Sequence, residues 1–142
     1  AVDVGRPLAL AVMDIDHFKA INDRHGHPVG DLVLRRVAAV LEDQVRGGDL
    51  LARVGGEEFA VLALDSDMAA ASLLGERLRA AVEAASPVEA GRALVPVTIS
   101  VGVATARIRA GDLLKTPERL LASADDALYR AKRNGRNRVE VA

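Results

Sequence analysis

The sequence has 142 residues, half of them hydrophobic and 27% charged, with no cysteine and a formal net charge of −1. This length suits one domain with a buried core, and the composition excludes a disordered tail, a disulfide framework and a cysteine nucleophile. The near-zero charge provides no basic field for DNA or RNA and no polybasic face for a membrane. No apolar run reaches the roughly 18 residues of a membrane span.

Apolar runs of strand length alternate along the chain with stretches whose apolar residues recur at helical spacing. The pair Gly55–Gly56 separates two of the strands and is predicted to supply the positive φ angles of a tight hairpin turn. In chain order the predicted elements are a strand at Leu8–Met13, helices at His17–Arg24 and Asp31–Val45, strands at Leu50–Val54 and Phe59–Leu64, a helix at Asp67–Ala85, one or two strands at Leu94–Thr105, a helix at Thr116–Asn134 and a strand at Arg138–Val141.

This order of elements predicts the fold class. A hairpin embedded between helices indicates an α+β sandwich, with a mixed and mostly antiparallel central sheet of about five strands flanked by helices. A doubly wound parallel sheet would need a helix between each pair of strands, which the order does not provide.

Two pairs of acidic residues lie next to predicted strands. Asp14 and Asp16 end the first strand, and Glu57 and Glu58 lie at the hairpin tip. If the first strand lies beside the hairpin, Asp14 and Glu57 converge, and a cation such as Mg²⁺ is needed to offset their repulsion. Alternatively, the aspartates only cap a helix and the glutamates form a solvated turn.

Polar residues at two other places are candidates for ligand contacts. Asn22 and Asp31 flank His27 after the first strand, and their side chains suit a guanine edge, although both residue types are also ordinary at turns and helix caps. Lys132 and Arg136 lie at the end of the last predicted helix and just after it. They suit a triphosphate, or they merely satisfy the carboxyl end of that helix.

Together these motifs resemble the GGDEF domain of diguanylate cyclases, in its GGEEF form at residues 55–59. The resemblance covers nearly the whole chain and rests on several spaced blocks in the family's order. The matching blocks are DIDHFK at 14–19, IND at 21–23, GHPVGD at 26–31, GGEEF at 55–59, TISVGVA at 98–104, and ADDALYRAK with GRNR at 124–132 and 135–138.

The resemblance implies a fold like that of the polymerase palm and the class III nucleotide cyclases. It implies condensation of two GTP molecules into cyclic di-GMP, dependent on Mg²⁺ or, as a substitute, Mn²⁺, in a homodimer whose two domains face each other. By resemblance, the metal ligands are the carboxylates of Asp14 and Glu57 and the carbonyl of Ile15. Either Glu57 or Glu58 is expected to help deprotonate the attacking 3′-hydroxyl.

The remaining roles also come from the resemblance. Asn22 and Asp31 are expected to hydrogen-bond the guanine, with His27 close to the substrate. Lys19, Lys132 and Arg136 are expected to meet the phosphates, with Lys19 also stabilising charge in the transition state.

A further match concerns regulation. Arg46 and Asp49 fit the RxxD signature of the family's inhibitory product site, at the expected spacing before Gly55. An arginine and an acid three residues apart can hold a guanine edge and a phosphate together, although the same pair also suits a surface ion pair.

The chain departs from the family pattern in two ways. It begins after the family's leading D-x-L-T-G-L segment, and Val54 stands where Tyr or Phe often precedes the glycine pair. We therefore expect residues 1–142 to be one GGDEF domain cut from a longer protein, cytoplasmic itself, with a parent that is either soluble or tethered to a membrane. The alternative to a working cyclase is a module that binds cyclic di-GMP or GTP without turnover.

Overall fold

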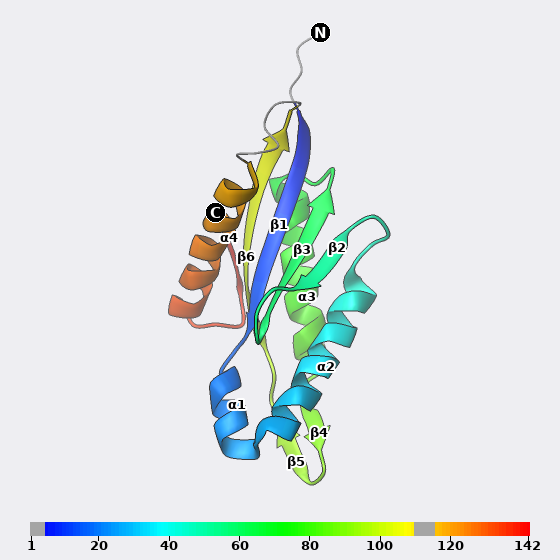
Figure 1. Cartoon of the computed structure of the whole chain (residues 1–142), viewed down its shortest axis with the longest axis vertical. Helices are drawn as coiled ribbons and strands as arrows, with labels where there is room; N and C mark the ends of the chain where they lie inside the picture. The colour runs from blue at the N-terminus through cyan, green and yellow to red at the C-terminus, as the bar shows by residue number, and fades with distance from the viewer. Residues whose placement is uncertain (1–4, 110–115) are drawn as a thin grey trace.

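The computed structural model describes residues 5–109 and 116–142, and they form a five-stranded sheet with helices on both faces (Figure 1). Pairing in the sheet is antiparallel except between the last two strands, so the sheet is mixed. Across the sheet the order is β2 (Leu50–Arg53), β3 (Glu58–Leu64), β1 (Arg6–Ile15), β6 (Ile99–Ile108) and β7 (Val139–Val141). The predicted α+β class and mixed sheet are confirmed.

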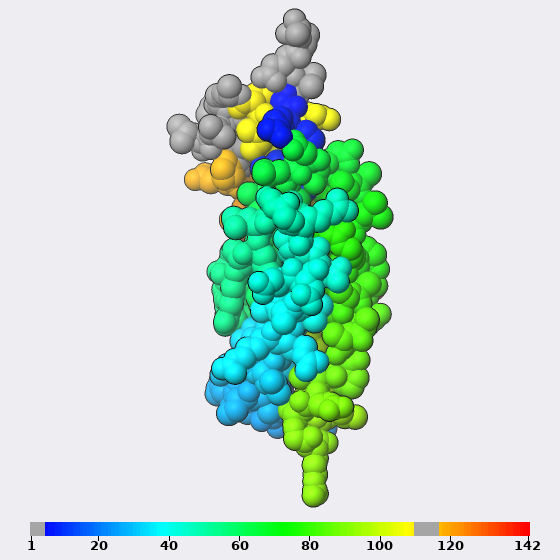
Figure 2. Space-filling view, turned by 90° about the vertical axis from the view of Figure 1, so that its right-hand side faces the viewer, coloured from blue at the N-terminus to red at the C-terminus, as the bar shows by residue number. Residues whose placement is uncertain are grey.

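Helices cover the two faces unequally. α2 (His27–Gln44) and α3 (Met68–Ala84) pack on one face, and α4 (Thr116–Arg133) covers the other, while α1 (Phe18–His25) lies beyond the end of β1 (Figure 1). In the space-filling view α2 runs along the outside of its face beside α3 (Figure 2). None of the helices among the described residues has the length and apolarity needed to cross a membrane.

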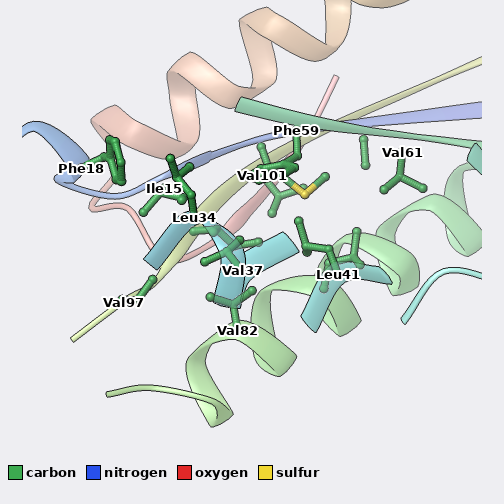
Figure 3. Packing of buried hydrophobic residues seen from close by; sticks show 14 of the residues in the cluster. Ile15, Phe18, Leu34, Val37, Leu41, Phe59, Val61, Val82, Val97 and Val101 are labelled. Atoms are coloured by element: carbon green, nitrogen blue, oxygen red, sulfur yellow. The ribbon is translucent and has the colours of Figure 1, made fainter. Parts of the chain in front are cut away.

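The larger core lies between the sheet and the α2–α3 layer. Side chains from β1, β3 and β6 meet those of α2 and α3 there, as Figure 3 shows for Phe59, Val101, Val37 and Val82. A smaller core under α4 contains Leu120 and Leu128 packed on Val12 of β1. Because successive side chains of β1 point to opposite faces of the sheet, this central strand contributes to both cores.

The contact between α4 and the sheet depends on one glycine. A Cβ at Gly102 of β6 would lie 2.2 Å from the backbone nitrogen of Leu128 and 2.3 Å from the carbonyl oxygen of Ala124. The helix backbone thus lies directly on the strand at this point. This close approach sets the position of α4, and with it the position of the side chains at the end of that helix.

The structure corrects three local predictions. Gly55 and Gly56 do not adopt positive φ. The connection between β2 and β3 is longer than a two-residue turn and is closed by a 2.9 Å hydrogen bond from the Val54 N–H to the Glu58 carbonyl, so it does not require positive φ at the glycines. α2 begins at His27 rather than Asp31, since proline is tolerated in a first helical turn. The segment before β6 contains a separate hairpin of β4 (Val88–Ala90) and β5 (Ala93–Val95) that the apolar pattern did not reveal.

Candidate functional site

A cavity of about 410 Å³ opens where β1 ends and α1 begins. We call it the main cavity because it contains most of the candidate site residues, although it is not the largest. Six of the residues to which the resemblance assigns a role line it, although they come from three separate segments of the chain, at 14–19, 57 and 132–136. These residues are Asp14, Ile15, Lys19, Glu57, Lys132 and Arg136. The cavity therefore contains both acidic and basic side chains within one small volume.

Strand pairing explains why the two acidic motifs meet. β1 and β3 are adjacent and antiparallel, with Asp14 opposite Glu58, and the Ile15 N–H donates to the Glu57 carbonyl over 3.2 Å. After Ile15 the chain turns through His17, whose φ of 57° lies in the left-handed region, and α1 then carries Lys19 to the cavity. Asp14 and Glu57 thus lie close together at the same end of two neighbouring strands, as the sequence predicted.

The basic side of the cavity comes from the end of α4. Lys132 forms a salt bridge with the carboxylate of Asp14, whose side chain is only 10% exposed. Arg136 also lines the cavity, and its guanidinium has no hydrogen bond or ion pair with the residues described. A cation therefore already faces Asp14, and a second cation is available to an anionic ligand.

The two neighbouring glutamates occupy different surroundings. Glu57 lines the main cavity, whereas Glu58 lines a cavity of about 190 Å³ beside Asp125 of α4. Burial raises the pKa of Glu58, and the negative charges of Asp14, Asp125 and Glu57 raise it further against the opposing effect of Lys132. The pKa of Glu58 is thus raised mainly because its carboxylate is partly buried, and only then because other acids lie nearby.

The residues predicted to recognise guanine lie outside the main cavity. Asn22 has a buried Oδ1 with no hydrogen-bond partner among the described residues, and it fits only because residue 30 is glycine, where a Cβ would lie 1.8 Å from that oxygen. Asp31 lines a cavity of about 240 Å³ with Arg35 and Arg53. His27 is exposed at the start of α2.

The RxxD residues line another cavity, of about 560 Å³. The Asp49 N–H donates to the Arg46 carbonyl over 3.0 Å, but no salt bridge joins the two side chains in the part of the chain that the structure describes. The surface ion pair considered as an alternative is therefore not formed. Both side chains are available to a ligand.

Two polar residues near the main cavity were not assigned a role from the sequence. Asp16 is buried and accepts hydrogen bonds from Ser100 Oγ over 2.6 Å and from Thr98 Oγ1 over 2.7 Å. The backbone N–H of Asn137 also donates to Asp16, over 3.0 Å. No local pattern could have revealed this contact, because the two residues lie 121 positions apart.

The donor set fits a divalent cation only in part. Among the described residues, no three side chains of His, Cys, Asp or Glu are close enough to hold a metal ion by themselves. Asp14 and Glu57 nevertheless provide hard oxygen ligands, and cations such as Mg²⁺ commonly complete their coordination with water and substrate phosphate.

Comparison with known proteins identifies relatives of the chain. Residues 1–138 match the family model described as diguanylate cyclase, GGDEF domain. The chain is 45% identical over 136 residues to the probable diguanylate cyclase DgcT of Escherichia coli, covering 95% of this chain and 29% of that protein. It is 47% identical over 137 residues to the response regulator PleD of Caulobacter vibrioides, again covering 95% of this chain and 29% of the relative.

Solved structures show the same fold. The GGDEF domain of DgcB from Caulobacter crescentus, in complex with c-di-GMP, matches with a TM-score of 0.86 and 34% identity over 95% of this chain and 77% of that one. The diguanylate cyclase SiaD from Pseudomonas aeruginosa, in complex with its activator SiaC, matches with a TM-score of 0.87 and 39% identity over 96% of this chain and 50% of that one.

Proposed function

Because the chain belongs to the GGDEF-domain family of diguanylate cyclases, we propose that it condenses two GTP molecules into cyclic di-GMP. One observation carries the proposal: Asp14 and Glu57 face Lys19, Lys132 and Arg136 across one cavity. Nucleotidyl transfer requires carboxylates for a divalent cation and fixed positive charge for phosphates within such a volume. The chain spans 29% of the relatives DgcT and PleD, and we propose that it is one cytoplasmic GGDEF domain of a longer protein.

The reaction consists of two equivalent phosphoryl transfers. In each, the 3′-hydroxyl oxygen of one GTP bonds to the α-phosphorus of the other, the bond to pyrophosphate breaks, and the hydroxyl proton passes to a base. Two such steps close the ring and release two pyrophosphates. We propose that each chain holds one GTP, so two copies must face each other as a homodimer.

Five charged residues of the cavity have a role in this scheme. Asp14, Glu57 and the Ile15 carbonyl would hold Mg²⁺, or Mn²⁺ in its place, which supplies positive charge to the phosphate oxygens when bound. Lys19, Lys132 and Arg136 would neutralise the phosphates, and Lys19 would also stabilise the transition state. We assign the base to Glu57 rather than Glu58, because Glu57 lines the same cavity as these cations.

Guanine recognition is proposed for the junction of α1 and α2. The unpartnered Oδ1 of Asn22 is an acceptor for a guanine N–H, and the Asp31 carboxylate is a second acceptor. His27, exposed at the start of α2, would lie close to the nucleotide. Phe18 lies between this junction and the main cavity. It lines the cavity, and its ring also packs close to Gly30 of α2, where a Cβ would lie 3.3 Å from Cζ.

We further propose that cyclic di-GMP binds at Arg46 and Asp49 and inhibits the enzyme. The two side chains line a cavity without forming a salt bridge to each other. The arginine would contact a phosphate or guanine edge, and the carboxylate would accept from guanine N–H groups.

The test is incubation of the full-length protein with GTP and Mg²⁺, scored for cyclic di-GMP by mass and for released pyrophosphate. Glu57→Gln should lower turnover by about a hundredfold or more, since it removes both a metal ligand and the base. The matched control is Glu89→Gln, an exposed glutamate on β4, which should leave turnover unchanged. Nucleotide binding without pyrophosphate release by the parent protein would instead favour a binding module.

A further inference from the structure

The turn that carries Arg136 has an unusual backbone. Gly135, Arg136 and Asn137 all have positive φ, at 126°, 64° and 44°. Residues other than glycine rarely adopt this region, and an arginine there is strained. The turn therefore needs contacts from the rest of the fold to keep it in place.

Asp16 provides the first of these contacts. Its carboxylate is 6% exposed, and one oxygen accepts from the Asn137 N–H while the hydroxyls of Thr98 and Ser100 complete the set. No salt bridge to Asp16 occurs within residues 5–109 and 116–142. Asp16 therefore lines the cavity with its oxygens already engaged by protein donors.

The side chain of Asn137 provides the second contact. Its Oδ1 accepts from Arg79 Nη1 over 2.8 Å, and its Nδ2 donates to Glu83. Arg79 is itself only 15% exposed and is paired with Glu76 and Glu83 along α3. A helix on the opposite face of the sheet from α4 thus holds the turn that follows α4.

Arg136 is the residue that these contacts place. Its N–H donates to the Ala131 carbonyl over 2.9 Å and its carbonyl accepts from Arg138 Nε over 3.2 Å, so its backbone is fixed on both sides. Its side chain lines the cavity and bonds to none of the residues described. The backbone is held and the guanidinium is left free for a ligand.

We propose that Asp16 and Asn137 are positioning residues that act through Arg136, with Arg79 and Glu83 supporting Asn137 from α3. The inference rests on the proposed function, because the ligand that Arg136 meets is the triphosphate of GTP. Asn137 touches no substrate in this scheme. It sets the direction in which the arginine points.

The first experiment measures GTP affinity of the full-length protein with Mg²⁺ by calorimetry. Asn137→Gly keeps the positive φ and the N–H bond to Asp16 but removes the bonds to Arg79 and Glu83, so the variant should fold. It should weaken GTP binding by about tenfold, as for a charge-assisted hydrogen bond. Asn134→Ala is the matched control on the same turn, since the Asn134 side chain bonds only to Glu140, which lines no part of the cavity, and the affinity of this variant should stay within about twofold of the parent.

A double-variant cycle separates positioning from general damage. If Asn137 acts through Arg136, Asn137→Gly should add nothing to the loss caused by Arg136→Ala. Additive losses, or an Asn137→Gly affinity within about twofold of the parent, would overturn the inference while leaving the proposed function standing. A parent protein that binds no GTP would overturn both. Binding of guanosine, which has no phosphate, should be equal in all variants, and a loss there would also overturn positioning through Arg136.

Discussion

Lys132 of α4 donates a hydrogen bond to the carboxylate of Asp14 on β1, across 118 positions of sequence. The ammonium group stands where the proposed function requires positive charge, beside a carboxylate that is almost fully buried. Asp14 and Lys132 thus neutralise each other at the centre of the candidate site. Several of the expected outcomes below depend on this balance.

Lys132→Ala should destabilise the fold by about 1 kcal/mol, because it leaves the Asp14 carboxylate without its partner while a third of the lysine side chain was exposed. Added Mg²⁺ should then raise the melting temperature more in the variant than in the parent, since the cation replaces the lost charge. Thermal unfolding with and without Mg²⁺ checks this. Arg6→Ala, which breaks the exposed pair with Asp65, is the control and should respond to Mg²⁺ as the parent does. Equal Mg²⁺ shifts in the parent and Lys132→Ala would contradict the expectation.

Glu58→Gln should change how stability depends on pH. The pKa of Glu58 is raised in the folded state by burial first and then by Asp14, Asp125 and Glu57, so the folded protein binds this proton more tightly than the unfolded chain does. Its stabilising contribution is complete below the usual glutamate pKa and is lost as pH rises through the raised value. The free energy of unfolding, measured by urea titration at a series of pH values, should therefore fall less with rising pH in the variant. Glu42→Gln, at an exposed glutamate on α2, is the control, and its curve of stability against pH should run parallel to that of the parent. A parallel curve for Glu58→Gln would contradict the prediction.

Gly102→Ala should lower the free energy of unfolding by about 2 kcal/mol or more, because the new methyl group meets the backbone of α4 rather than a movable side chain. Urea denaturation measures the effect. Gly47→Ala is the matched control, since a Cβ there meets nothing within 4 Å and the residue does not have positive φ. A Gly102→Ala protein as stable as the control would mean that α4 can move off the sheet at little cost.

Arg46→Ala should raise the concentration of cyclic di-GMP needed for half inhibition by about tenfold or more, through loss of a charge-assisted contact. Turnover without added product should stay at the parent level, because Arg46 lies outside the main cavity. Initial rates at increasing cyclic di-GMP provide the measurement. Arg92→Ala, at an exposed arginine on the β4–β5 hairpin, should be inhibited like the parent. Unchanged inhibition of Arg46→Ala would place the inhibitory site elsewhere.

Much of the fold was predictable because its central elements carry strong local patterns. The apolar strand β1, the amphipathic α2 and the Asp67 cap of α3 all follow from periodicity and capping rules. The Asp67 side chain accepts from the Ala70 N–H over 2.9 Å. The segment Leu94–Thr105, predicted to hold one or two strands, contains most of β5 and much of β6. β4 and its pairing with β5 were missed because each of these strands has only three residues, too few for a period of two to be recognised. The prediction of positive φ at Gly55 and Gly56 was wrong, because a glycine pair permits positive φ without requiring it.

The candidate site was predictable where its residues occur in short motifs. Asp14 and Glu57 could be paired from the sequence because each adjoins a strand, and adjacency of those strands brings them together. The contacts of Asn137 with Asp16 and Arg79 could not be predicted, because they depend on how α3 and the turn after α4 approach across the sheet. Which glutamate shares the cavity with Lys132 also depends on side-chain direction at the strand edge.

The distance in sequence between Asp14 and Lys132 has a consequence during translation. A ribosome releases the acidic strand and hairpin well before it releases the basic segment, so a nascent chain exposes the carboxylates without their counterions. The cavity therefore has both its acidic and its basic side chains only when α4 lies against β6 at Gly102.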